Sequence, residues 1–170
     1  MNFRRIFLSL SILLTLLFFS CYFYYTNFLI PKRSGEIEAP GILNNTHVSF
    51  DKWGVPHIEA VDEKDAYYAL GFLHGQDRWF QIEILKRLAT GQLSEVFGKK
   101  ALDSDKFFRT LGIREISKKI VAKAKKDSPS YGALEAYAAG LNYYIESSAR
   151  PLEAKILGIP PTKYTVEDAF

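Results

Sequence analysis

The sequence has a single cysteine, Cys21, and only three histidines among its 170 residues. One cysteine cannot form a disulfide within the chain, and it excludes a metal site built from several cysteines. The histidines are His47, His57 and His74, and no two of them have the i, i+4 spacing that holds a metal ion on one helix face. We therefore expect structural or solvated roles for all three.

Several familiar catalytic and cofactor motifs are also missing. The chain has no G-x-S-x-G nucleophile turn, no phosphate-binding loop and no dinucleotide fingerprint. Asp103 and Asp105 are close in sequence, but no further ligand stands at the offsets of a calcium loop, so we do not expect a metal there. The sequence assigns no catalytic, cofactor-binding or metal-binding residue.

No acidic residue precedes Glu36, which makes the net charge of +3 misleading. Four basic residues flank the N-terminal apolar run: Arg4, Arg5, Lys32 and Arg33. Without these four, 18 basic residues stand against 19 acidic ones. A nearly neutral body predicts no basic face for nucleic acid. The five lysines between residues 118 and 126 are interpreted as the solvated side of one helix.

The longest hydrophobic run is Ile6–Ile30, 25 residues without a charge. At about 1.5 Å per residue, a helix of this length spans the ~30 Å hydrocarbon core of a bilayer. The short basic N-terminus favours an N-in orientation. We expect residues 1–33 to be an uncleaved membrane anchor. A cleaved secretory signal and a lipoprotein signal processed at Cys21 stay open as alternatives, and all three export the rest of the chain.

Proline, glycine, serine and asparagine are frequent in residues 31–45, and this composition predicts a linker at 34–45. A hairpin is predicted next. Residues 46–50 alternate in polarity, 51–54 have the Asp and Gly of a β-turn, and 55–60 return as the second strand. Pro56 lacks an N–H and belongs on a sheet edge.

A long helix is predicted to begin at Asp62, whose side chain can cap it. Gly71 and Gly75 weaken its middle, so we predict a kink or break near Gly75. Glu83 stands four residues before Arg87, which predicts a supporting pair on the surface. Apolar side chains at helical spacing predict the buried stripe: Ala66, Ala69, Leu70, Leu73, Trp79, Ile82, Leu85 and Leu88.

Further helical signals follow. Gly91 and Gly98 bound a short segment, and residues 101–124 have a mixed helical pattern. Ser128 and Pro129 are a good helix start, and the apolar positions after them are Leu134, Tyr137, Ala138, Leu141 and Ile145. Prolines and a glycine interrupt residues 151–161, and residues 165–168 have the pattern of a new helix cap.

Asp77 and Arg78 place two charges inside an apolar helix. A buried charge needs a partner, so we expect both side chains to be at least half buried and paired. We interpret them as a structural ion pair that fixes helix packing. The alternative is a polar network that holds a functional site.

Taken together, these motifs resemble the penicillin acylase (penicillin amidase) family across nearly all of residues 46–170. The order and spacing of the motifs are specific, although each is weak alone. Gly75 stands where alanine is usual, and Ile82 stands where methionine is usual. The matching stretches are 51–58, 71–72, 76–78, 81–83, Arg87, 91–95, Gly98, Asp105, Arg109 and 137–142.

The resemblance implies an α+β fold, the N-terminal part of the αββα sandwich of N-terminal-nucleophile hydrolases. This part would be mostly helical with an N-terminal β-hairpin and would follow a membrane-spanning leader helix. Members are exported precursors that cut themselves into an α chain and a β chain. The serine that begins the β chain is the nucleophile, and its own amine is the base. We expect this chain to be the leader and the truncated front of the α chain, with those groups beyond Phe170.

The implied function is that of an amide hydrolase precursor, which removes an acyl group from an amide such as a β-lactam side chain or an acyl-homoserine lactone. The 170 residues alone are expected to be inert. The alternative is a membrane-anchored remnant or binding protein that keeps α-chain packing without catalysis. The family allows a calcium ion in the complete protein but assigns no cofactor here.

The expected partners are the β chain of the same precursor, a small acyl-amide substrate and the membrane, with no nucleic acid. The expected location is the bacterial cell envelope. The chain would be anchored in the inner membrane, with the body on the periplasmic side.

Overall fold

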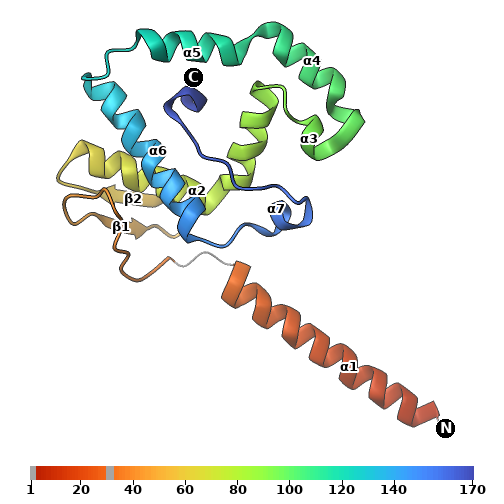
Figure 1. Cartoon of the computed structure of the whole chain (residues 1–170). Helices are drawn as coiled ribbons and strands as arrows, with labels where there is room; N and C mark the ends of the chain where they lie inside the picture. Colours follow the sequence, from red (N-terminus) through yellow and green to blue (C-terminus); the bar gives the residue numbers. More distant parts are fainter. Residues whose placement is uncertain (1–2, 30–32) are drawn as a thin grey trace. The chain divides into compact units, whose positions relative to one another are not determined.

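A computed structural model describes residues 3–29 and 33–170, and the chain divides into two compact units, Met1–Ser34 and Gly35–Phe170 (Figure 1). The first unit contains helix α1 (Phe3–Tyr24) and the π-helical turn η1 (Tyr25–Leu29). Its segment Ile6–Asn27 has a mean hydropathy of 2.3 and is long and apolar enough to cross a membrane, a test that a signal sequence also passes. Three residues lie outside the described part of the chain: Ile30, the end of the predicted apolar run, and Pro31 and Lys32 of the predicted anchor.

The second unit is mostly helical and has one small sheet, as predicted. Its elements in chain order are β1 (His47–Phe50), β2 (Pro56–Glu59), α2 (Glu63–Ala89), α3 (Ser94–Phe97), η2 (Gly98–Ala101), α4 (Leu102–Leu111), α5 (Ile113–Lys123), α6 (Pro129–Ser147), α7 (Leu152–Ile156) and η3 (Val166–Ala169).

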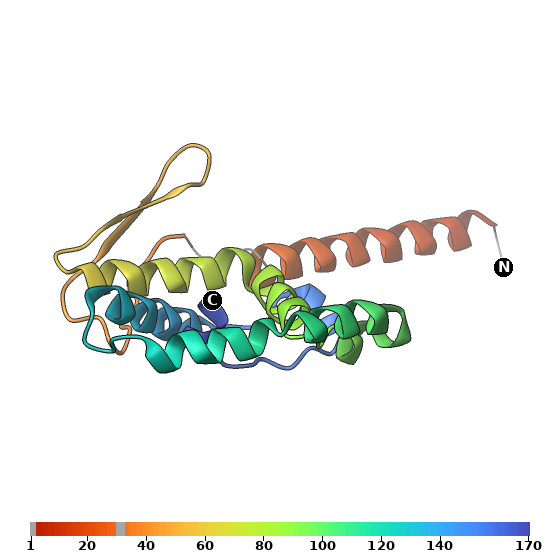
Figure 2. The same cartoon turned by 90° about the horizontal axis from the view of Figure 1, so that it is seen from above.

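Strands β1 and β2 form the predicted antiparallel hairpin, in which Phe50 pairs with Pro56. The Asp51 carboxylate closes the turn, because it accepts hydrogen bonds from the N–H groups of Trp53 and Val55, both at 2.8 Å. Gly54 has a φ of 79°, which suits glycine. Figure 2 shows the hairpin extending away from the helices.

Helices α2 and α6 lie against each other, as both ribbon views show (Figures 1 and 2). A Cβ atom on Gly71 would overlap the carbonyl oxygen of Tyr137, and one on Gly140 would overlap the carbonyl oxygen of Tyr68. The two backbones approach this closely only because neither glycine has a side chain. Gly71, which the sequence pattern marks as a helix weakness, and Gly140, within the matching stretch 137–142, are therefore contact points between the two helices.

The start of α2 is as predicted, because Asp62 accepts a hydrogen bond from the Lys64 N–H at 2.7 Å. The kink lies at Arg78, which has non-helical φ and ψ of −145° and 28°, and not at Gly75. Gly75 instead makes room for the Tyr144 side chain, which a Cβ would meet. A kink near Gly75 was predicted, and it lies three residues later.

Beyond the kink, the buried face of α2 differs from the predicted stripe. Leu85 was expected inside and is 61% exposed. Glu83 and Arg87, expected on the surface, are 2% and 6% exposed. The buried positions Trp79, Glu83 and Arg87 are four residues apart, whereas the predicted stripe advances in steps of three from Trp79 and so drifts around the helix, away from the buried face.

The largest buried core lies where α2, α6 and the C-terminal segment meet. Its members are Trp79, Leu141, Ala154 and Ile159. Helix α6 begins as predicted, with Ser128 as its cap and Pro129 in the first turn. The C-terminal segment ends in the short 3-10 helix η3, whose start has the predicted capping pattern in Thr165 and Asp168.

Helices α4 and α5 run along one edge of the second unit, between α3 and α6 (Figure 1). They are separated by Gly112, which has a left-handed φ of 70°. The mixed helical pattern of residues 101–124 is thus two helices with a break. The lysines at 118, 119, 123, 125 and 126 are exposed, as predicted.

Candidate functional site

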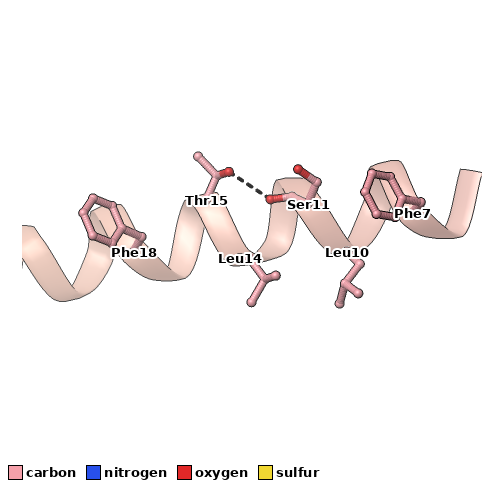
Figure 3. Close-up of a pocket in the computed structure, with 6 residues that line it drawn as sticks. All are labelled: Phe7, Leu10, Ser11, Leu14, Thr15 and Phe18. Atoms are coloured by element: carbon pink, nitrogen blue, oxygen red, sulfur yellow. Dashed lines mark hydrogen bonds between the residues drawn. The ribbon is translucent and has the colours of Figure 1, made fainter.

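Two hollows were found on the described residues, and neither is an enclosed pocket for a small molecule. One hollow is lined only by α1 (Phe7, Leu10, Ser11, Leu14, Thr15 and Phe18), so it is a concave strip on a single helix (Figure 3). Its two polar side chains are linked along the helix, where the Thr15 hydroxyl donates to the Ser11 carbonyl at 2.9 Å. A second cavity, beside Trp79 and Tyr144, has a volume of about 10 Å³, which is room for about one water molecule.

Three serines of the second unit serve local structure. Ser117 donates to the Ile113 carbonyl, and Ser128 donates to the Lys125 carbonyl while it caps α6. Ser94 hydrogen-bonds to the Asp105 carboxylate. Burial acts to raise the pKa of Asp105, but hydrogen bonds from Ser94 and Leu93 outweigh it and keep that pKa below its usual value. A carboxylate so stabilised is a weak base, so Ser94 is not activated as a nucleophile.

The three histidines do not come together. His47 and His57 are exposed in the hairpin, and the His57 Nε2 is 3.9 Å from an Asp51 oxygen. His74 lies half-buried in α2, with its Nδ1 at 3.0 Å from the Tyr137 hydroxyl. Burial and the nearby Arg78 lower the pKa of His74. Among residues 3–29 and 33–170, no group of three or more His, Cys, Asp or Glu residues is arranged to hold a metal ion.

Two tyrosines of the second unit, Tyr68 and Tyr164, are not bases at neutral pH. Burial, with the nearby Tyr137 and Asp168, raises the pKa of Tyr164 to about 12. Burial, with Tyr143 and Glu146, does the same for Tyr68. These rings therefore serve as apolar surface with a hydroxyl donor.

Asp77 and Arg78 do not form the buried pair that we predicted. Their side chains are 58% and 54% exposed and contact each other, with the Arg78 Nη2 at 2.7 Å from an Asp77 oxygen. Both residues lie at the kink, where Arg78 has non-helical φ and ψ. The prediction rested on their apolar neighbours in the sequence, which do not determine the direction of a helical side chain. The pair is therefore a surface feature in this structure.

A buried ionic network lies one to two turns further along α2, at a place that sequence reasoning assigned to the surface. The Arg87 Nε donates to Glu83 at 2.8 Å, and its Nη1 donates to Glu95 of α3 at 2.7 Å. The second Glu83 oxygen accepts from the Thr162 hydroxyl at 2.8 Å and faces the Lys86 ammonium at 3.3 Å. The network joins α2 to α3 and to the C-terminal segment.

Asn142 connects α6 to the C-terminal segment through the backbone of Tyr164. Its amide nitrogen donates to the Tyr164 carbonyl, and its amide oxygen accepts from the Tyr164 N–H, both at 2.8 Å. Asp105 connects α4 to α3 in the same way, because it accepts from the N–H groups of Leu93 and Ser94, both at 2.8 Å. Arg109 donates to the Gly91 carbonyl at 2.9 Å.

Asp65 fastens the segment before the hairpin. It is 1% exposed and accepts hydrogen bonds from the N–H groups of Leu43 and Asn44, both at 2.9 Å. The bond from Leu43 lowers the pKa of Asp65, and those from Asn44 add to this effect against the opposing effect of burial. Most of the motif residues are thus explained as framework, since they hold helices and loops together rather than face a substrate.

Comparison with known proteins agrees with this framework. The sequence profile of the penicillin amidase family matches residues 45–170. The chain is 39% identical over 138 residues to the penicillin acylase 2 proenzyme of Pseudomonas sp. (strain SE83), covering 78% of this chain and 17% of that protein. It is 32% identical over 143 residues to the acyl-homoserine lactone acylase QuiP of Pseudomonas aeruginosa, covering 82% of this chain and 16% of that protein. The chain therefore spans about one sixth of these curated relatives.

A solved structure agrees in fold. The thermostable penicillin G acylase from Alcaligenes faecalis superposes with a TM-score of 0.65 and 26% sequence identity, covering 75% of this chain and 69% of that chain. The predicted fold class, a mostly helical part of a penicillin acylase with a two-stranded sheet, is thereby confirmed. Because the family profile matches far more than half of its residues, this chain belongs to the penicillin amidase family.

Proposed function

We propose that the chain is the front of the α chain of an exported, self-processing acylase that hydrolyses a linear acyl amide. The match of the family profile to residues 45–170 carries the proposal. The names of the relatives add to it, since they are acylases of penicillins and acyl-homoserine lactones and one is a proenzyme. Both substrate classes contain an acyl group in amide linkage, which is the bond we propose for cleavage.

Within this function, the 170 residues supply framework and not the reacting groups. Acyl transfer needs a nucleophile, a base and an oxyanion site within hydrogen-bond reach of one another. The hydroxyls of Ser94, Ser117 and Ser128 are engaged in caps and helix bonds. Amide cleavage therefore requires the β chain of the same precursor, which we propose as the partner of the second unit.

We propose that the chain has the three parts that its sequence predicts: a membrane anchor at 1–33, a linker at 34–45 and the α-chain part at 46–170. Helix α1 supports the anchor, because it continues past Cys21 to Tyr24 without a break. The second unit would then face the periplasm. An anchored chain stays in the membrane pellet after alkaline carbonate extraction, whereas recovery of a soluble protein that begins between Ser34 and Asn45 shows a cleaved signal.

The activity is tested on the complete reading frame that contains these residues. Expression of that frame should give two chains on a denaturing gel and turnover of a chromogenic phenylacetyl amide or long-chain acyl amide. The matched control is residues 34–170 expressed alone, for which we expect no turnover. A complete, processed protein that cleaves neither amide disproves the acylase proposal. It would favour the membrane-anchored, non-catalytic alternative.

A further inference from the structure

The stretch of chain before the hairpin is fastened to the helices of the second unit. Its composition predicts a linker at 34–45, yet the second unit already begins at Gly35. Attachments to α2 and α6 are found from Glu38 to Asn44, and we use "strap" for Glu38–Asn44. Whether such a segment can be removed depends on its hydrogen bonds and burial, and not on its position in the sequence.

The first half of the strap contacts a pair of tyrosines, one from each helix. At its start, the Tyr143 hydroxyl of α6 donates to the Glu38 carbonyl at 3.0 Å. Further along, the backbone lies against the ring of Tyr68 in α2, because a Cβ atom on Gly41 would be only 3.1 Å from a ring carbon. Gly41 has a φ of 104°, a conformation that favours glycine. The two tyrosine rings also contact each other, with centroids 6.4 Å apart. The strap therefore connects α6 to α2 at this pair.

The end of the strap is held by the buried carboxylate of Asp65 in α2. This carboxylate accepts from the N–H groups of Leu43 and Asn44, both at 2.9 Å, and from the Asn44 side-chain amide at 3.1 Å. Asp65 is 1% exposed, and among the described residues only these two donate to its carboxylate. A buried charge needs such donors. The strap and the start of α2 therefore stabilise each other.

We propose that the strap is an integral part of the α-chain unit and stays on it, whether the leader is kept as an anchor or removed as a signal. The linker of the proposed organisation is then limited to residues 34–37. Removal of a leader hydrolyses one peptide bond with one water molecule and leaves a new amine on the exported unit. We place the start of that unit at or before Glu38.

The contacts of the strap explain why the unit does not begin later. A start after Gly41 removes the backbone that lies against the Tyr68 ring, and this ring is 3% exposed. A start after Asn44 also removes the donors that stabilise the charge of Asp65. The placement of the start rests on the proposed export of a precursor. The attachments themselves lie within the second unit and do not depend on that proposal.

The test is limited proteolysis of the 170-residue chain in detergent micelles with thermolysin, which cleaves on the amino side of isoleucine and leucine. The fragments are followed over time by mass spectrometry. The bond before Ile37 lies outside the strap, and the bond before Leu43 lies inside it. These side chains are 59% and 80% exposed, so exposure alone predicts that the bond before Leu43 is cut at least as fast. A fastened strap predicts the opposite order.

We expect cleavage before Leu43 to be at least about tenfold slower than cleavage before Ile37, because the strap must open first and its hydrogen bonds to a charged group oppose opening. Asp65→Ala should speed cleavage before Leu43 at least about tenfold. Glu63→Ala is the matched control, because it removes an exposed carboxylate from the same first turn of α2 and should leave the rate unchanged. Tyr143→Phe removes only the hydroxyl that holds the start of the strap, so we expect a smaller increase of about twofold or more.

Two results overturn the inference: cleavage before Leu43 that is as fast as before Ile37, or an unchanged rate in Asp65→Ala while its circular dichroism is native. If Asp65→Ala loses its native circular dichroism, Tyr143→Phe decides, and an unchanged rate there overturns the inference. N-terminal sequencing of the α chain from the complete reading frame should give a start at or before Glu38, and a start within 39–45 also overturns it. None of these readouts uses turnover, so an inactive protein disproves the acylase proposal alone.

Discussion

Before the kink at Arg78, helix α2 meets α6 through glycine, and beyond the kink the same helix meets α3 and the C-terminal segment through charged side chains. At the first contact, Gly71 and Gly140 allow backbone to touch backbone. At the second, Glu83 and Arg87 are almost fully buried and share partners with Glu95 and Thr162. One helix thus combines two kinds of packing, one disrupted by added volume and the other by removed charge.

The glycine contact is sensitive to added volume, because the neighbouring atoms are backbone and cannot move aside. The ionic contact is sensitive to removed charge, because a partner left alone in the interior loses its compensation. The difference predicts which substitution breaks each half of α2. The free energy of unfolding can be measured in detergent micelles by urea titration of Trp79 fluorescence, since Trp79 is 3% exposed and reports on the core.

The largest effect is expected for Glu83→Ala. The substitution leaves the Arg87 guanidinium, 7% exposed, without its buried partner, which is 2% exposed. Loss of one member of a buried pair costs about 3–5 kcal/mol. Glu95→Ala is the matched control, because Glu95 contacts the same Arg87 but is 53% exposed; its loss should cost under about 1 kcal/mol. Equal losses for the two variants would contradict a network centred on Glu83.

Gly140→Ala should have the next largest effect. The added methyl group overlaps the Tyr68 carbonyl and forces α2 and α6 apart, which costs about 1–3 kcal/mol or more. Gly132→Ala in the same helix is the control. There the new Cβ meets only the flexible end of Lys64, at 3.2 Å, and alanine is the better helix former by about 1 kcal/mol. Destabilisation by both variants alike would show that helix propensity, not contact, decides.

A smaller effect should appear in the pH dependence. Hydrogen bonds hold the pKa of Asp65 and of Asp105 below the usual value. A depressed pKa in the folded state contributes stability that is present above the unfolded value of about 3.9 and is lost as pH falls through the folded value. Unfolding free energy should therefore decline below about pH 4. Asp65→Asn should flatten that decline, and an unchanged slope would contradict the assignment to Asp65.

The sequence predicted the features that depend on near neighbours. Asp51, Asp62 and Ser128 each bond to backbone groups two to four residues away, so their residue type and position were enough to place the turn and two helix starts. The family resemblance came from the same residues that now prove to be framework. Gly71 was visible only as a weak point of its helix, and Gly140 only as part of a family motif, because the helix that each one touches is far away in sequence.

The placements that failed concern which side chains of α2 point inside. Glu83 lies inside, where the Thr162 hydroxyl reaches it from 79 positions away. That contact has no local signature, so the pair at 83 and 87 looked like an ordinary surface pair. Leu85 was placed inside because the predicted stripe advanced in steps of three from Trp79, whereas the buried positions Trp79, Glu83 and Arg87 are four apart. Asp77 was placed inside because apolar residues flank it in the sequence, and they do not determine the direction of its side chain.

The smallest effect is expected for Asp77→Ala, which tests whether this ion pair lies on the surface. Both Arg78 contacts, at 3.1 Å and 2.7 Å, go to one Asp77 oxygen, and both side chains are more than half exposed. Water and salt screen such a pair, so we expect a loss below about 0.5 kcal/mol. Arg78→Ala with Asp77→Ala should cost no more than the sum of the single variants. A loss of about 3 kcal/mol for Asp77→Ala would place its charge in the interior and restore the original prediction of a buried pair.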